Sequence, residues 1–155
     1  TLSVALAAAL DTVSLREYGR ERWEQRKGHL IFEDMLHIAQ TQTLWEMTAC
    51  PNQYLVCDTS PLTTLFYSLA MFGRADPLLE ELACRHYDTV ILCADDFVFH
   101  QDGTRQDESF RERQQQWYIE ELTRRDIPFL YVTGGVEQRV EQILDHISPS
   151  QALNI

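Results

Sequence analysis

Four short hydrophobic runs, at residues 12–17, 53–57, 89–93 and 129–133, constrain the fold of this chain more than any other feature. Longer stretches with apolar residues at helical spacing separate them. Strands without in/out alternation are buried on both faces, which is what a parallel sheet requires. The alternation of such strands with amphipathic helices predicts an α/β fold, a three-layer doubly wound parallel sheet.

Capping and turn residues indicate where the intervening helices begin and end. Ser60-Pro61 places a capping residue before a proline at the first helical position, and Asp76-Pro77 repeats the signal. Gly73 follows a helical stretch as its C-terminal stop. The expected helices are residues 2–10, 20–27, 30–49, 61–72, 77–85, 109–125 and 136–147.

Composition indicates one globular domain and excludes several kinds of partner. The 155 residues are 45% hydrophobic and carry 13 basic against 24 acidic residues, a formal charge of −11. Such a chain repels a phosphate polyelectrolyte, so we expect no nucleic-acid partner, although a local cluster of donors can still bind a small anion. No apolar run reaches about 18 residues, so we expect no membrane span. The domain covers residues 1–147, and a polar tail follows over residues 148–155.

Cysteine and histidine usage gives no sign of a metal site. The four cysteines have no C-x-x-C spacing, and the five histidines are scattered. We therefore expect four buried, reduced thiols and a cytoplasmic location.

Two acidic residues lie at the carboxyl ends of expected strands, where doubly wound sheets place their chemistry. Glu17 closes the first run, and Asp58 directly follows the second. Phosphoryl transfer needs one carboxylate to orient or deprotonate the attacking hydroxyl and another to hold Mg²⁺ or its waters. Glu17 and Asp58 are candidates for these roles; the alternative is that each is a solvated strand-end acid or a helix cap.

Arginines near the same strand ends are candidates for phosphate recognition. Arg20 lies about one helical turn after Glu17, where it can donate to a substrate phosphate or ribose, or pair with a neighbouring glutamate. Arg105, Arg111 and Arg113 lie on or just after a polar loop and can close over a triphosphate. The alternative for this second group is a solvated surface, paired with the acidic residues of the same stretch.

Several segments follow the order and spacing of one known family. The segments are Glu17-Tyr-Gly-Arg-Glu21, Ile38-Ala-Gln-Thr-Gln42, Cys57-Asp-Thr59 followed by Thr63-Thr64, Tyr87-Asp-Thr-Val-Ile-Leu92 and Asp102-Gly-Thr-Arg105. Together they resemble the kinase half of the NadR-like family, the ribosylnicotinamide kinases, which are P-loop enzymes. The resemblance runs from Thr1 to about Ile147.

The resemblance implies transfer of the γ-phosphoryl group of ATP to the 5′-hydroxyl of a ribosyl-pyridine nucleoside, with Mg²⁺. It implies that Glu17 lies close to the accepting hydroxyl and that Asp58 takes the metal-side, Walker-B-like position. Arg20 would contact substrate or phosphate, and Gln42 would line the nucleoside pocket. An aromatic that often precedes the Glu-Tyr-Gly-Arg run is replaced by Arg16 here, and Tyr18, Trp23 and Trp45 are the candidates to substitute for it.

On the nucleotide side, the same resemblance implies that Arg105 belongs to a lid, with Arg111 and Arg113 nearby. Thr1 would directly follow the Lys-Ser or Lys-Thr pair of a phosphate loop, or be its hydroxyl residue; the alternative is an ordinary helix cap. A parallel sheet cannot omit its central first strand without leaving unpaired backbone groups on both neighbours. We therefore expect roughly a dozen residues upstream of Thr1 that read as a strand, a Gly-rich loop and a lysine.

Three functions remain open from the sequence. The first is a small-molecule kinase with ATP and Mg²⁺ that acts on a nucleoside, and a homo-oligomer is compatible with it. The second is a regulatory module that senses ATP, GTP or a pyridine nucleotide without turnover. The third, an α/β scaffold that binds no nucleotide, leaves the strand-end acids without a role.

Overall fold

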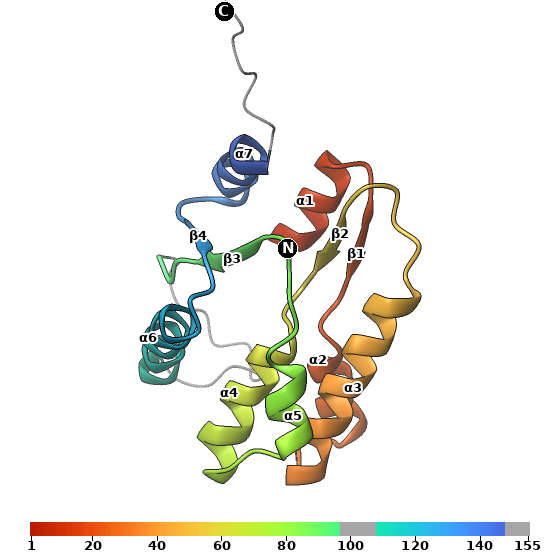
Figure 1. Cartoon of the computed structure of the whole chain (residues 1–155), viewed down its shortest axis with the longest axis vertical. Coiled ribbons are helices and arrows are strands. Elements are labelled where there is room, and N and C mark those ends of the chain that lie inside the picture. The colour runs from red at the N-terminus through yellow and green to blue at the C-terminus, as the bar shows by residue number, and fades with distance from the viewer. Residues whose placement is uncertain (97–107, 148–155) are drawn as a thin grey trace, which may run out of the picture. The chain divides into compact units, whose positions relative to one another are not determined.

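The computed structural model describes residues 1–96 and 108–147, which belong to two compact units (Figure 1). The first unit comprises Thr1 and residues 3–86, and the second comprises Leu2 and the chain from Tyr87 onward. Both units combine helices with parallel strands, so the α/β class expected from the sequence is confirmed.

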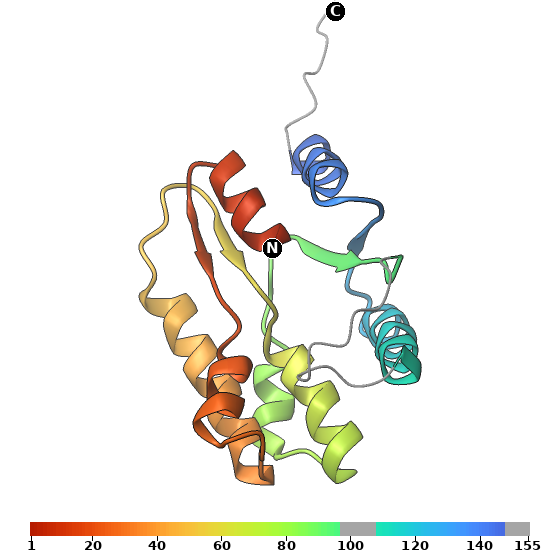
Figure 2. The same cartoon turned by 180° about the vertical axis from the view of Figure 1, so that it is seen from behind.

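The first unit places two strands beside a group of helices. Its helices are α1 (Leu2–Ala9), α2 (Tyr18–Gln25), α3 (Phe32–Thr48), α4 (Pro61–Phe72) and α5 (Pro77–Leu82), and its strands are β1 (Val13–Leu15) and β2 (Leu55–Cys57). The strands pair in parallel, with Val13 opposite Leu55 and Leu15 opposite Cys57. Both run toward helices α2–α5, so their carboxyl ends lead into the helical group (Figures 1 and 2).

Local signals in the sequence account for the boundaries of α4 and α5. Pro61 occupies the first turn of α4, and Gly73 ends it in the left-handed region at φ 66°. Asp76 caps α5 by accepting a hydrogen bond from the Leu78 amide at 2.8 Å. Proline at the first helical position and glycine after the last need no tertiary contact to act, which is why both predictions are confirmed.

The core of the first unit lies among its helices. Its buried apolar residues are Leu6, Ala7, Tyr18, Met35, Ile38, Ala39, Leu65, Phe66, Leu79 and Ala83. Asp34 is also buried and accepts from Arg22 Nε at 2.7 Å, from Arg26 Nε at 3.1 Å and from the Ile31 amide at 3.0 Å. This cluster ties α2 to the start of α3, because a buried carboxylate is stable only when it is paired and hydrogen-bonded.

The second unit contains β3 (Val90–Cys93), α6 (Glu108–Arg124), β4 (Phe129–Val132) and α7 (Val136–Ile147). The strands pair in parallel, with Val90 opposite Phe129 and Cys93 opposite Val132. Thr133 is the residue that follows β4. The Gln142 side chain accepts from its amide at 3.2 Å and donates to its carbonyl at 2.9 Å. A side-chain amide here satisfies backbone groups that a neighbouring strand would otherwise pair.

The single three-layer doubly wound sheet predicted from the sequence is not shown. The described strands form two separate sheets of two strands each. Within residues 1–96 and 108–147, no strand pairs with the second edge of β2 or of β3. The strands are also less buried than predicted: no residue of β1 or β2 is fully buried, because a two-stranded sheet has too few neighbours to cover it.

No helix within the described ranges has both the length and the apolar character to cross a membrane.

Candidate functional site

The pairing of β1 with β2 brings Glu17 and Asp58 to the same end of one sheet. Leu15 and Cys57 are opposite each other in the register, and the Asp58 amide donates to the Leu15 carbonyl at 2.8 Å. Glu17 is the N-cap residue of α2, two positions after β1 ends. Parallel strands share an edge for their carboxyl ends, so the two acids predicted from the sequence do lie together.

Burial and charge act on Glu17 in this position. Burial raises the pKa of Glu17 above its ordinary value, the negative charge of Asp58 raises it further, and the positive charge of Arg20 lowers it in part. Gly19 leaves room for the carboxylate, because a Cβ atom there would lie 3.3 Å from Glu17 Oε1. Glu17 is therefore a partly desolvated acid held near a second carboxylate and a guanidinium group.

Arg20 is exposed, and its positive charge is close enough to Glu17 to lower the pKa of that carboxyl group. Among the residues the structure describes, it forms no ion pair with Glu17 or Glu24, the alternative role that the sequence left open. Its guanidinium group therefore keeps its donors available for an anionic ligand.

A serine that sequence reasoning missed contacts the second acid. Ser3, on the first turn of α1, donates from its hydroxyl to Asp58 Oδ2 at 2.9 Å. The Thr1 hydroxyl lies 2.9 Å from Ser3 Oγ and also accepts from the Val4 amide at 3.5 Å, so Thr1 caps α1 as well. The contact joins residues 55 positions apart, and no local pattern in the sequence indicates it.

The residue after Asp58 adopts a strained backbone. Thr59 has φ 74°, in the left-handed region that β-branched residues rarely enter. Such a conformation costs about 1–3 kcal/mol and persists only where the surrounding structure enforces it. It turns the chain sharply between Asp58 and Pro61, the first residue of α4.

Tyr18 and Gln42 lie on the core side of Glu17. The Tyr18 amide donates to Gln42 Oε1 at 3.3 Å, and the Tyr18 hydroxyl lies 3.0 Å from His37 Nε2. Gln42 is buried, and its Nε2 finds no hydrogen-bond partner in the described residues. A buried donor without an acceptor costs about 1–3 kcal/mol, so Gln42 is suited to donate to a ligand oxygen.

Of the candidate substitutes for the missing aromatic, Tyr18 is buried in the core, whereas Trp23 and Trp45 are half-buried. Tyr18 is 7% exposed and packs edge-to-face against Trp45, with 5.2 Å between the ring centroids. The Arg16 guanidinium group lies 6.0 Å from the centroid of the Trp45 ring and pairs with Glu21 at 2.7 Å. Trp23 packs against Gly28. These rings have packing partners already.

The arginines predicted on the nucleotide side belong to the second unit. Arg105 lies outside the described residues. Arg111 donates to the Asp95 carbonyl at 3.0 Å, and Arg113 Nε donates to the Ser109 carbonyl at 3.4 Å while its guanidinium lies 5.6 Å from the Phe110 ring. These contacts are to main-chain carbonyls and a ring of the second unit, and they test neither pairing with the acidic residues of the stretch nor a role with nucleotide.

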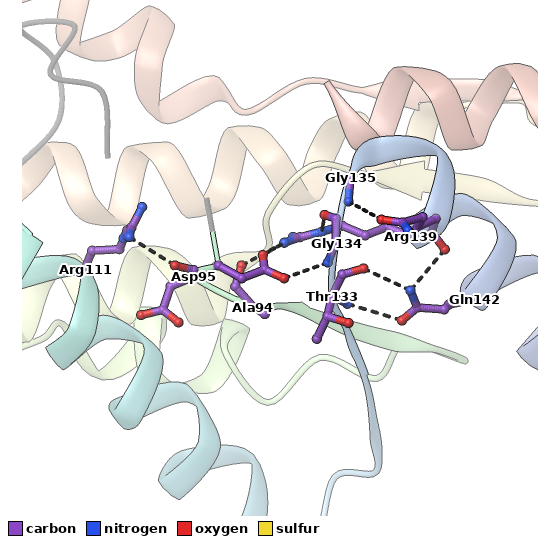
Figure 3. A network of polar contacts seen from close by, with 10 residues as sticks. Ala94, Asp95, Arg111, Thr133, Gly134, Gly135, Arg139 and Gln142 are labelled. Carbon is purple, nitrogen blue, oxygen red and sulfur yellow. Dashed lines mark hydrogen bonds and ion pairs between the residues drawn. The ribbon is translucent and has the colours of Figure 1, made fainter. Parts of the chain in front are cut away.

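A buried arginine joins the ends of β3 and β4 in the second unit (Figure 3). Arg139, on α7, donates to the Gly134 carbonyl at 2.7 Å, to the Ala94 carbonyl at 3.0 Å and to the Asp96 carboxylate. Asp96 in turn accepts from the Gly134 amide at 2.6 Å. The Gly134 amide and the Arg139 charge hold the pKa of Asp96 below its ordinary value, despite some loss of solvation. Sequence reasoning missed this network, in which Asp96 lies three positions after the last residue of β3.

The thiols differ from the expectation of four buried groups. Cys50, Cys84 and Cys93 are exposed, because they lie at the ends of elements rather than inside them. Cys57 is partly buried on β2, where burial and the charge of Glu46 raise the pKa of its thiol to about 12. A thiol with such a pKa is not a nucleophile at neutral pH.

The donor set beside Glu17 fits a magnesium ion that is shared with phosphate. Within the described ranges no group of three or more His, Cys, Asp and Glu side chains is arranged to hold a metal ion alone. Mg²⁺ usually takes one or two carboxylates, with water and substrate phosphates completing its shell. Asp58 supplies such a carboxylate, with the Ser3 hydroxyl next to it.

Comparison with known proteins gives one family. A family model described as an AAA domain matches residues 1–139, which covers the whole first unit and the second unit as far as the start of α7. No match was found among curated proteins.

Proposed function

The chain belongs to the AAA domain family, whose members are P-loop NTPase-like, and from this premise we propose that it is an ATP-dependent small-molecule kinase. The proposed acceptor is the 5′-hydroxyl of a ribosyl-pyridine nucleoside, ribosylnicotinamide, which gives the protein a role in NAD salvage. The observation that carries the proposal is the convergence of Glu17 and Asp58 at one end of the β1–β2 sheet.

In the proposed reaction the hydroxyl oxygen attacks the γ-phosphorus of ATP, the bond to the β-phosphate oxygen breaks, and ADP leaves. Glu17 takes the hydroxyl proton. Its raised pKa supports this role, because a general base works best when its pKa approaches the working pH. Arg20 donates to the nucleoside or to the transferred phosphoryl group, whose charge it offsets.

Asp58 is the proposed ligand of Mg²⁺ or of its waters. When bound, the ion neutralises charge on the β- and γ-phosphates. Gln42 and Tyr18 are proposed to line the nucleoside pocket, and the unpartnered Gln42 Nε2 supports this assignment. Thr1, Arg105, Arg111 and Arg113 are the proposed residues of the nucleotide side.

The proposed complete domain is a three-layer doubly wound sheet over residues 1–147. Among the described residues, no strand pairs with the second edge of β2 or with the second edge of β3. The amide and carbonyl of Thr133, just after β4, have the Gln142 side chain as their partner. This supports β4 as an edge strand of that sheet. The proposed setting is the cytoplasm, without nucleic acid or membrane as partner.

A coupled assay of ADP release with the full-length protein tests the proposal. The acceptors are ribosylnicotinamide, its carboxylate analogue, purine and pyrimidine nucleosides, and buffer alone. We expect ADP release that depends on a ribosyl-pyridine acceptor, with one phosphate added per ADP formed. ATP binding without ADP release for any acceptor contradicts the kinase and supports the regulatory module.

A further inference from the structure

We propose that Ser3 is a positioning residue for Asp58, whose carboxylate it orients so that one oxygen remains available to a divalent cation. The inference rests on the proposed function, because it takes Asp58 as the metal-side acid. It goes beyond that function in assigning a role to Ser3, which no sequence motif singles out.

The hydrogen bonds around Ser3 run in one direction. A carboxylate only accepts, so in the 2.9 Å contact with Asp58 Oδ2 the single hydroxyl proton of Ser3 points at Asp58. The Thr1 hydroxyl, 2.9 Å from Ser3 Oγ, must then donate to Ser3. The Val4 amide donates to Thr1 Oγ1, so the three groups form a chain of donors that ends on Asp58.

The backbone holds the other side of Asp58. Its amide is fixed to the Leu15 carbonyl, and the strained turn at Thr59 follows directly. With the main chain fixed on both sides, the remaining freedom of the residue is the rotation of its side chain. Ser3 removes that freedom by holding Oδ2, while Oδ1 accepts no hydrogen bond from any described residue.

This arrangement matches what cation sites generally need. A carboxylate ligand bound by a neighbouring donor keeps its orientation, and loss of such a donor typically lowers metal affinity or activity by about 10–100-fold. Ser3 is only partly buried and lies on the first turn of α1, so its hydroxyl adds nothing to the core. A role that is only structural therefore predicts little effect on metal binding when the hydroxyl is removed.

Direct titration of Mn²⁺, followed by electron paramagnetic resonance on the full-length protein, tests the inference. Ser3→Ala keeps the helix, because alanine is the stronger helix former, and removes only the hydroxyl. We expect it to weaken Mn²⁺ binding about tenfold or more, without lowering the unfolding midpoint. In turnover, the variant needs more Mg²⁺ for half-maximal rate while the KM for the nucleoside stays unchanged.

Two variants serve as matched controls. Ser3→Thr keeps a hydroxyl at the same position, and we expect it to restore Mn²⁺ binding to within about threefold of wild type. Ser14→Ala makes the same substitution on β1 of the same unit, where Ser14 lies opposite Val56 and, among the described residues, donates no hydrogen bond to Asp58, and it should bind Mn²⁺ as wild type does. Wild-type binding by Ser3→Ala, or equal loss in Ser3→Ala and Ser3→Thr, overturns the inference.

Asp58→Asn separates the failure of this inference from failure of the proposed function. If Asp58→Asn loses Mn²⁺ binding while Ser3→Ala keeps it, Ser3 has no positioning role and the assignment of Asp58 stands. If both variants bind Mn²⁺ as wild type does, Asp58 is not the metal-side acid and both proposals fail together.

Discussion

The Asp58 amide donates to the Leu15 carbonyl at 2.8 Å, one position beyond the last residue of β2. Glu17 follows Leu15 by two residues, so the register of the parallel pair determines how far apart the two carboxylates lie. The contact is made by main-chain atoms. Substitutions of the side chains at positions 17 and 58 therefore leave the sheet in place and report on chemistry.

Glu17→Gln is expected to raise the free energy of unfolding at neutral pH while it lowers turnover. The folded-state pKa of Glu17 is raised, so its stabilising contribution is complete below the unfolded-state pKa and is lost as pH rises through the folded-state value. Glutamine resembles the protonated acid and does not titrate. Urea unfolding of both proteins between about pH 4 and pH 7 should show that the free energy of unfolding of the variant, relative to that of wild type, increases as pH rises. A variant that is less stable than wild type at neutral pH contradicts this account.

The same pKa shift sets the acid limb of the pH–rate profile. A general base must be ionised, so kcat/KM falls as pH drops through the raised pKa of Glu17, above the ordinary range of a glutamate. Measurement of kcat/KM against pH on the full-length protein checks this. A limb at or below the ordinary glutamate value rules out Glu17 as the base.

Gln42→Met is expected to raise the KM for the nucleoside about tenfold or more, because it removes the Nε2 donor and also leaves the Tyr18 amide without its acceptor, and to leave the KM for ATP unchanged. Thr43→Val is the matched control, since Thr43 Oγ1 is also buried without a hydrogen-bond partner in the described residues and lies next to Gln42 on α3. Valine has the same shape as threonine, so this variant should keep its KM. Equal effects of the two substitutions would mean that the site does not use Gln42.

Asp34→Asn is expected to destabilise the protein by about 3–5 kcal/mol, because it leaves two arginines without their buried partner. Burial alone would raise the pKa of Asp34, but the Ile31 amide and the guanidinium groups of Arg22 and Arg26 outweigh it, and the net direction is down. This contribution is present above the unfolded-state pKa and is lost as pH falls through the folded-state value. Urea unfolding at neutral and acid pH measures both effects, and a loss below about 1 kcal/mol at neutral pH refutes the prediction.

Arg139→Lys is expected to cost about 2 kcal/mol or more, because an ammonium group cannot reach the Gly134 carbonyl, the Ala94 carbonyl and Asp96 together. Arg124→Lys is the control: Arg124 is exposed and pairs with Glu121, so its replacement should change stability by less than about 0.5 kcal/mol. Thermal and urea unfolding compare the two. A similar small effect of both substitutions would show that the Arg139 network is not needed for folding.

Features that depend on local chemistry were predictable from the sequence. The starts of α4 and α5 follow from Pro61 and Pro77, whose fixed φ angles favour the first helical turn. The meeting of Glu17 and Asp58 follows from strand ends alone, because parallel strands place their carboxyl ends at one edge.

Features that depend on tertiary contacts were not predictable. Ser3 meets Asp58 across 55 positions, and Arg139 meets Ala94 across 45, with no periodic pattern to indicate either contact. The free donor of Gln42 follows from which of its two amide atoms the Tyr18 backbone uses, which composition and spacing do not determine. The division of the strands between two sheets depends on which edges find a partner, and the hydrophobic runs do not carry that information.

The most direct test of the central claim, that Glu17 and Asp58 together carry phosphoryl transfer, is the rate of ribosylnicotinamide-dependent ADP release by full-length Glu17→Gln and Asp58→Asn. Removal of a general base typically lowers turnover by about 10²–10⁴-fold, and we expect losses of that order in both variants with no fall in the unfolding midpoint. Near wild-type turnover in both folded variants contradicts the account.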